Sequence, residues 1–393
     1  MSEHDLSRRG FVGGAAALAA LSSTGSVAQA APSAPVTLNI IDVAGNLALT
    51  QPAFEEYRKA KPNFVSRMTF NKAPAPELPG KLKAQQDARR VDIDLVLTGT
   101  DALAAGIEQK LWVDIMGEHG AKLPKLDTIF EKGASMMQSL TAGQGVCVAW
   151  YPSGPLLEYM PDKVKAAPAT TDELLAWAKA NPNKLVYARP ANSGPGRTWI
   201  MGLPYLLGDK DPKDPAKGWD KTWAYLKELG QYIEYYPTGT GATMKELGEG
   251  TRDIIISTTG WDINPRVLGV VPKEAKIQTL KGFRWVIDGQ FMAIPKGVDA
   301  DKMIVLIDLI NFMLTKQAQA YIYDKGYLYP GPAVKDVPLS MAPKESQDAI
   351  SEYGRPEYEK LFAEVPMELP LTPEQMVIAF RIWDEQIGTK KTK

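Results

Sequence analysis

A glycine-rich segment that contains one arginine, Asn192–Thr198 (NSGPGRT), is the first candidate for binding chemistry in this chain. It follows a short apolar run and precedes a segment whose pattern predicts a helix to about Leu207. Free backbone N–H groups at the start of a helix can hold an anion, and a guanidinium can add a bidentate contact. We therefore expect Ser193, Gly194 and Arg197 to bind ligand. In the alternative interpretation, Ser193 only caps the helix and Arg197 lies on the surface.

An aromatic residue and an acid, Trp261 and Asp262, follow a second apolar run, Asp253–Ser257. An aromatic face over a cationic group contributes about 0.5–2 kcal/mol, and an adjacent carboxylate would pair with the same cation. The two residues therefore predict a site for a positively charged group. In the alternative interpretation, Trp261 packs in the core and Asp262 caps the next helix.

Three further polar residues follow predicted strands near the start of the chain. Asn46 comes after the run 36–41, and Thr98 and Thr100 come after the run 92–97. Ligands in layered α/β proteins bind beyond the carboxyl ends of the strands, so these side chains are candidate hydrogen-bonding groups. Helix capping by the two threonines is an equally good explanation.

The composition excludes several classes of function. The 45 Lys and Arg residues nearly balance the 46 Asp and Glu residues, which argues against a nucleic-acid or anionic-membrane binder. The two histidines are His4 and His119, and the only cysteine is Cys147. With two histidines and one cysteine, the chain cannot form Cys/His zinc clusters or intrachain disulfides. We predict neither a metal nor a cofactor. We expect Cys147 to be a buried apolar residue.

Alternating strand and helix patterns must position these residues. Apolar β-branched runs predict strands at 36–41, 64–70, 92–97, 145–151, 184–188 and 253–257. Amphipathic periods and capping signals predict helices at 52–60, 77–89, 196–207, 219–235 and 299–314, with others starting near 171 and 372. Such alternation indicates an α/β protein with a mostly parallel sheet. Trp219 and Trp223 share one helix face, so we expect both in the core.

The first thirty residues read as an export signal. Arg8 and Arg9 precede a short, weakly apolar run, and Ala28–Ala30 forms a small-residue cleavage signal. The arginine pair resembles a twin-arginine signal, and an ordinary secretory signal is the alternative. We expect cleavage after Ala30 and a periplasmic product that does not span the membrane.

Three features together resemble the extracellular solute-binding proteins of family 1 of ABC importers, notably their polyamine-binding members. The first is the exported start followed by a strand, loop and helix at 38–57, and the second is the pair of strands that end near Thr98 and Trp261. The most specific feature is Trp285–Gly297 (WVIDGQFMAIPKG) followed by Ile310–Ala318 (INFMLTKQA). Its order and spacing are similar to the family's W-x-D, A-I-P-x-G and I-N-F-L-L pattern.

The resemblance implies a two-lobed periplasmic-binding-protein fold of type II, with the ligand held in a cleft between the lobes. By analogy, residues 31–145 and 285–365 form the first lobe, 146–284 form the second, and 366–393 form a terminal helix packed on both. The resemblance also implies ligand contacts for Trp285 and Asp288, and packing in a strand between the lobes is the alternative. One position departs from the polyamine pattern, because Gln290 stands where those relatives have the amine-binding Asp.

The resemblance implies that this is not an enzyme but the binding component of an ABC importer, a monomer that delivers a small polar solute to a membrane permease. A second hypothesis is an exported hydrolase or lyase with Asp262 and Asp288 as acid and base. A third is a ferric-ion binder on the same fold with Tyr and Asp ligands. The solute's charge stays open at this point, since Arg197 favours an anion, Asp262 and Asp288 favour a cation, and a zwitterion would use all three.

Overall fold

Two β-sheets organise the chain in the computed structural model, which describes residues 31–388. The predicted export signal, residues 1–30, and the cleavage point after Ala30 lie outside the described residues. None of the helices in the described part combines the length and hydropathy that a membrane span requires.

The larger sheet has seven strands, in the order β10-β4-β9-β3-β1-β2, with β11 paired to the beginning of β9. These strands are β1 (Val36–Asp42), β2 (Val65–Lys72), β3 (Leu95–Thr98), β4 (Val146–Gly154), β9 (Trp285–Ala293), β10 (Gly331–Pro332) and β11 (Met367–Glu368). The smaller sheet has four strands in the order β6-β7-β5-β8. They are β5 (Leu156–Tyr159), β6 (Leu185–Val186), β7 (Ile254–Ser257) and β8 (Lys276–Gln278).

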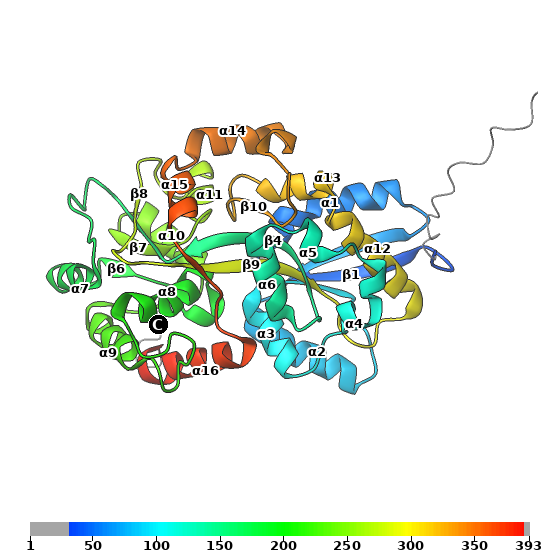
Figure 1. Ribbon diagram of the computed structural model, residues 1–393, viewed down its shortest axis with the longest axis horizontal. Helices are drawn as coiled ribbons and strands as arrows, with labels where there is room; N and C mark the ends of the chain where they lie inside the picture. Colours follow the sequence, from blue (N-terminus) through cyan, green and yellow to red (C-terminus); the bar gives the residue numbers. More distant parts are fainter. Residues whose placement is uncertain (1–30, 389–393) are drawn as a thin grey trace, which may run out of the picture. The chain divides into compact units, whose positions relative to one another are not determined.

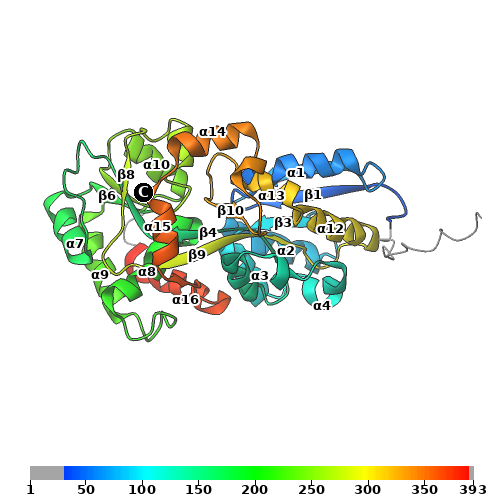
Figure 2. The same cartoon turned by 45° about the horizontal axis from the view of Figure 1, so that its top comes forward.

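Helices flank both sheets (Figures 1 and 2). Those in the first part of the chain are α1 (Leu47–Ala60), α2 (Leu78–Asp87), α3 (Thr100–Glu108), α4 (Ile115–His119), α5 (Leu126–Ile129) and α6 (Lys132–Gln138). The middle contributes α7 (Thr171–Ala180), α8 (Gly194–Leu207), α9 (Asp220–Leu229), α10 (Thr240–Gly248) and α11 (Asn264–Val267). The last are α12 (Ala300–Met313), α13 (Lys316–Ala320), α14 (Lys344–Tyr353), α15 (Glu357–Glu364) and α16 (Pro373–Trp383).

The expectation of a mostly parallel sheet is wrong. β1 pairs in parallel with β2 and β3, but β9 runs antiparallel to both β3 and β4. The reason is the route of the chain, because β4 leads directly into β5 of the smaller sheet and β9 returns from β8. Figure 1 shows these two long strands running side by side between the two groups of helices. Every residue of β4 and β9 is buried.

Each sheet has its own apolar core. Leu38, Ile40 and Phe54 belong to the core around the larger sheet, and Trp199 and Ile255 belong to that around the smaller sheet. The expected burial of Trp219, Trp223 and Cys147 is confirmed by the structure. The residue boundaries of the two lobes remain a prediction.

The last helix, α16, starts where the sequence indicated, because the Thr372 hydroxyl caps it by accepting the N–H of Gln375. It packs beside α3, while its end is buried in the core of the smaller sheet (Figure 1). There Trp383 donates to the Tyr187 hydroxyl at 3.0 Å, and the Arg189 guanidinium lies over the indole ring. The helix therefore contacts elements of both sheets.

A buried cluster of charges lies beside the smaller sheet. Glu158 on β5 is fully buried, and the Ser257 hydroxyl on the neighbouring strand β7 is the hydrogen-bonding group beside its carboxyl. Burial, and after it the negative charge of Asp262, raise the pKa of Glu158 to about 8, although the Ser257 hydroxyl and then Arg355 and Arg266 act in the opposite direction. A carboxyl group in such a place is easier to bury as the neutral acid.

This shifted pKa predicts a pH-dependent stability. Between pH 4.5 and about 8 the folded chain keeps a proton on Glu158 that the unfolded chain releases, so stability falls as the pH rises through this window. Glu158→Gln removes the titration, and we expect it to be more stable than the parent at pH 9 by at least about 1 kcal/mol, with a smaller difference at pH 5. Urea unfolding at both pH values measures this. The exposed Glu274→Gln is the control, and a difference that does not change with pH would contradict the prediction.

Candidate functional site

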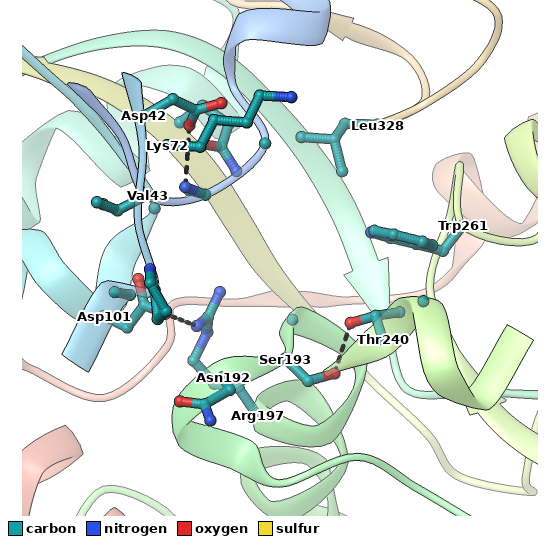
Figure 3. Close-up of a pocket in the computed structure, with 18 of the residues that line it drawn as sticks. Asp42, Val43, Lys72, Asp101, Asn192, Ser193, Arg197, Thr240, Trp261 and Leu328 are labelled. Carbon is teal, nitrogen blue, oxygen red and sulfur yellow. Dashed lines mark hydrogen bonds and ion pairs between the residues drawn. The ribbon is translucent and has the colours of Figure 1, made fainter. Parts of the chain in front are cut away.

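A pocket of about 450 Å³ opens between the loops that follow strands of the two sheets (Figure 3). From the larger sheet and its helices it is lined by Asp42, Val43, Ala44, Gly45, Lys72, Ala73, Pro74, Ala75, Pro76, Gly99, Asp101, Tyr151, Gln290, Tyr327 and Leu328. From the smaller sheet and its helices it is lined by Asn192, Ser193, Gly194, Arg197, Thr238, Thr240, Gly241 and Trp261. The pocket lies where β1, β2 and β3 end, as expected for an α/β protein.

The first turns of several helices border this pocket. The Ser193 hydroxyl caps α8 by accepting the N–H of Gly196 at 3.2 Å, and it shares a hydrogen bond of 2.7 Å with the Thr240 hydroxyl at the start of α10. The starts of α8 and α10 are thereby joined beside the pocket. The amino end of a helix carries a partial positive charge, so these turns present an electropositive edge.

Arg197 is the central charged group of the site. It lies in the first turn of α8, is 5% exposed, and reaches two carboxylates. One Nη atom is 3.1 Å from Asp101 on α3, and the other is 2.6 Å from Asp288 on β9. Burial lowers the pKa of Arg197, but the charges of Asp288 and Asp101 outweigh it and raise that pKa above its ordinary value. The surface position of the alternative interpretation is therefore wrong.

Asp288 supports Arg197 from behind the pocket. Its carboxylate also accepts hydrogen bonds from the Thr100 hydroxyl, from the Tyr151 hydroxyl at 3.1 Å, and from the N–H of Gly289. Burial, and after it the charge of Asp288, raise the pKa of Tyr151 well above its ordinary value, so this tyrosine remains a donor. Asp288 is not among the residues that line the pocket, and its role is to hold Arg197.

Two aromatic rings form one wall of the pocket. The rings of Trp261 and Tyr327 lie 5.3 Å apart at an angle of 58°. Gly260, which precedes the tryptophan, has a φ of +91°, and a Cβ there would lie 2.4 Å from the Tyr327 carbonyl oxygen. Only glycine fits this close approach, which places the indole of Trp261 at the pocket (Figure 3).

Asp262 lies behind Trp261 and does not line the pocket. It is fully buried, accepts from Arg355 Nε at 2.8 Å, and accepts the N–H of Gly260 at 3.0 Å. Its carboxylate therefore fixes the loop that presents Trp261. It does not cap α11, whose N-cap residue is Ile263.

Trp285 lies outside the pocket as well. Its ring is fully buried between Phe283 and Phe362, and its Nε1 donates to the Leu361 carbonyl oxygen. These contacts fit the alternative interpretation, in which Trp285 packs in the strand that connects the two sheets.

The remaining predicted residues surround the pocket without lining it. Asn46 precedes α1, is fully buried, and has no hydrogen-bond partner for its carboxamide among the described residues. Thr98 is fully buried and donates to the Gly99 carbonyl oxygen, and Thr100 donates to Asp288. Of the predicted residues, Ser193, Gly194, Arg197 and Trp261 are therefore the ones that line the pocket.

Several lining residues were not anticipated. Asp101, Lys72 and Gln290 bring charge or hydrogen-bonding groups, and Thr240 and Gly241 bring the start of α10. The sequence carried a signal for Thr240 and Gly241, because Gly-Thr-Gly at 239–241 stands at the start of a helical pattern. Gln290 and Asp288 are the polar side chains of the mostly apolar strand β9, and their spacing of two residues places both on the same face.

No group of three or more His, Cys, Asp and Glu side chains in residues 31–388 has the arrangement of a metal site. The carboxylates that line the pocket are Asp42 and Asp101. Asp42 accepts three backbone N–H groups, from Ala44, Asn46 and Leu47, each at 3.0 Å, and Asp101 pairs with Arg197.

Comparisons with known proteins give a consistent result. The sequence profile described as "Bacterial extracellular solute-binding protein" matches residues 53–350. No curated protein matches the chain at a significant level. The chain is similar in structure to a spermidine/putrescine ABC transporter substrate-binding protein from Streptococcus pneumoniae, with 13% identity, a TM-score of 0.58, and coverage of 88% of this chain and 99% of that chain.

Two further similar structures have other ligands in their names. A periplasmic binding protein from Actinobacillus pleuropneumoniae with bound fructose-6-phosphate is 16% identical, with a TM-score of 0.61 and coverage of 89% and 98% of the two chains. A ferric binding protein from Campylobacter jejuni is 15% identical, with a TM-score of 0.63 and coverage of 88% and 98%. The expected two-lobed periplasmic-binding-protein fold of type II, and the resemblance that predicted it, are confirmed.

The Arg197 contacts predict an unequal effect of two substitutions. Asp288→Asn leaves a buried guanidinium without its closest counter-charge, and we expect it to lower the free energy of unfolding by about 3–5 kcal/mol. Asp101→Asn is the matched control. It should cost less, because the Asp101 side chain is partly exposed and Arg197 keeps Asp288. Urea unfolding at pH 7 compares the two, and an equal or larger loss for Asp101→Asn would show that this account of Arg197 is wrong.

Proposed function

Since the chain belongs to the bacterial extracellular solute-binding proteins, we propose that it captures a small polar solute in the pocket and delivers it to the membrane permease of an ABC importer. The observation that carries this proposal is the composition of the pocket, because both sheets and their helices contribute to its lining. A solute held there contacts both halves of the chain at once. The pocket volume of about 450 Å³ is large enough for a small metabolite.

Capture of this kind depends on a change in the separation of the two halves. β4 and β9 connect the sheets, so a small change of backbone angles at their ends would open or close the pocket. A solute that makes more contacts in the closed form shifts the population toward that form. The permease would then recognise the closed chain, which we propose acts as a monomer in the periplasm.

The positions of two carboxylates favour capture over hydrolysis. Asp262 and Asp288, the acid and base of the enzyme hypothesis, are both bound to arginines and do not line the pocket. A general acid or base must reach the atom whose proton it transfers. Neither carboxylate is placed for that role in this structure.

The hypothesis of capture is tested by a thermal-shift screen of the purified protein against amines, amino acids, sugars, organophosphates and vitamins. We expect at least one class to raise the melting temperature, with the compound recovered unchanged after incubation. Small-angle scattering with that compound should show a smaller radius of gyration. Formation of a product that is abolished by Asp262→Asn or Asp288→Asn would overturn the proposal.

Trp261→Ala should weaken binding of the compound found in that screen at least tenfold, because it removes the larger ring of the aromatic wall. Isothermal titration calorimetry measures the affinity. Trp177→Ala is the matched control, since Trp177 is also partly exposed but lies on α7 outside the pocket. Unchanged affinity in Trp261→Ala, or an equal loss in the control, would place the binding site elsewhere.

A further inference from the structure

The acidic groups in and behind the pocket are already bound by the chain. Asp42 accepts three backbone N–H groups at the start of α1. Asp101 accepts the N–H of Ala102 and pairs with Arg197, and Asp288 accepts from four donors behind it. These donors take up much of the acceptor capacity and negative charge that a cationic solute would use.

Two positively charged or electropositive groups at the pocket, Lys72 and the start of α10, have fewer partners within the chain. Lys72 at the end of β2 is exposed, lines the pocket, and pairs with no carboxylate in the part of the chain that the structure describes. The nine-residue helix α10 starts at the pocket with Thr240 and Gly241, and its N-cap residue, Gly239, has no side chain to cap it. The first turn of α10 contains no acidic residue, whereas at the start of α1 the Asp42 carboxylate accepts the N–H of Leu47. A helix start of this kind attracts an anion.

Gln290 gives an independent indication that the pocket binds a polar group. It lines the same pocket from β9, is 4% exposed, and its Oε1 has no hydrogen-bond partner among the described residues. A buried polar atom without a partner costs about 1–3 kcal/mol, so buried polar groups are normally satisfied. Since an amide oxygen accepts hydrogen bonds, a solute with an N–H or O–H group near β9 would supply its partner.

We propose that the solute is an organic anion, whose phosphate or carboxylate group lies at the start of α10 and whose polar remainder is hydrogen bonded by Gln290. This inference rests on the proposed function and narrows its substrate class. Lys72 adds a positive charge at the pocket, and Trp261 lies in its wall, where the carbon skeleton would pack (Figure 3). The neutral carboxamide of Gln290 makes no ion pair with an amine.

Calorimetric titration with two sets of probes tests this class. Inorganic phosphate and glycerol 3-phosphate represent phosphates, malate represents carboxylates, and spermidine and putrescine represent amines. We expect a phosphate or the carboxylate to bind at least tenfold more tightly than either amine, with an affinity that falls as salt is raised. Binding of an amine as tight as that of any anion would overturn the inference. The proposed function would survive that result if Trp261→Ala abolished the amine binding.

Gly241→Asp places a permanent carboxylate at the start of α10. No heavy atom lies within 4 Å of the added Cβ, and an acidic residue in the first turn stabilises a helix, so the variant should fold. We expect anion affinity to fall at least tenfold. Gly241→Asn is the matched control, with the same shape and no charge, and it should bind within threefold of the parent. Retained anion binding in Gly241→Asp, or an equal loss in Gly241→Asn, would show that the anion is not held by the charge of this helix.

Gln290→Leu separates a binding role from a packing role. Because it removes an unpartnered buried polar group, we expect the melting temperature of the ligand-free protein to stay the same or rise. Affinity for the tightest-binding anion should nevertheless fall at least fivefold. A lower melting temperature with unchanged affinity would assign Gln290 to packing and overturn its part in the proposal.

Discussion

The guanidinium of Arg197 is a full positive charge held almost entirely out of water, and such a charge is stable only where carboxylates meet it. Asp288 comes to it from β9 and Asp101 from α3, while Arg197 itself lies on α8. Three elements that are far apart in the sequence are therefore held at fixed positions around one group. Arg197 and Asp101 line the pocket, so these ion pairs fix the positions of α3 and α8 at its edge.

The same constraint decides which groups remain for a solute. Carboxylates that a sequence-based interpretation assigns to a cationic ligand are bound to arginines or to backbone N–H groups. Three polar groups of the pocket can still bind a solute. They are the start of α10, the ammonium of Lys72 and the carboxamide of Gln290. Similar folds carry the names of polyamine, sugar-phosphate and ferric-ion binders, which indicates that the scaffold sets the geometry and that a few side chains set the ligand.

Support for the aromatic wall comes from outside the pocket. Asp262 binds the Gly260 N–H and Arg355, so the segment between α14 and α15 holds the loop that presents Trp261. Two neighbouring residues therefore have different roles. Trp261 lines the pocket, and Asp262 fixes the backbone that positions it. The buried Glu158 carboxyl beside this loop, whose pKa is raised to about 8, makes its surroundings sensitive to pH.

The sequence by itself determined the family, the α/β class and most of the elements, because these depend on local periodicity, capping residues and short motifs. It also predicted Ser193, Gly194, Arg197 and Trp261 as site residues, and these line the pocket because they follow strands or start helices at the sheet edge. Only the tertiary structure decided that β4 and β9 run antiparallel, that Asp262 and Asp288 lie behind the pocket, and that Trp285 packs away from it. The physical reason is that charge pairing and burial join residues about 90 to 190 positions apart, such as Arg197 with Asp288 and Thr100 with Asp288. The sequence pattern alone does not predict which acidic side chain pairs with which arginine.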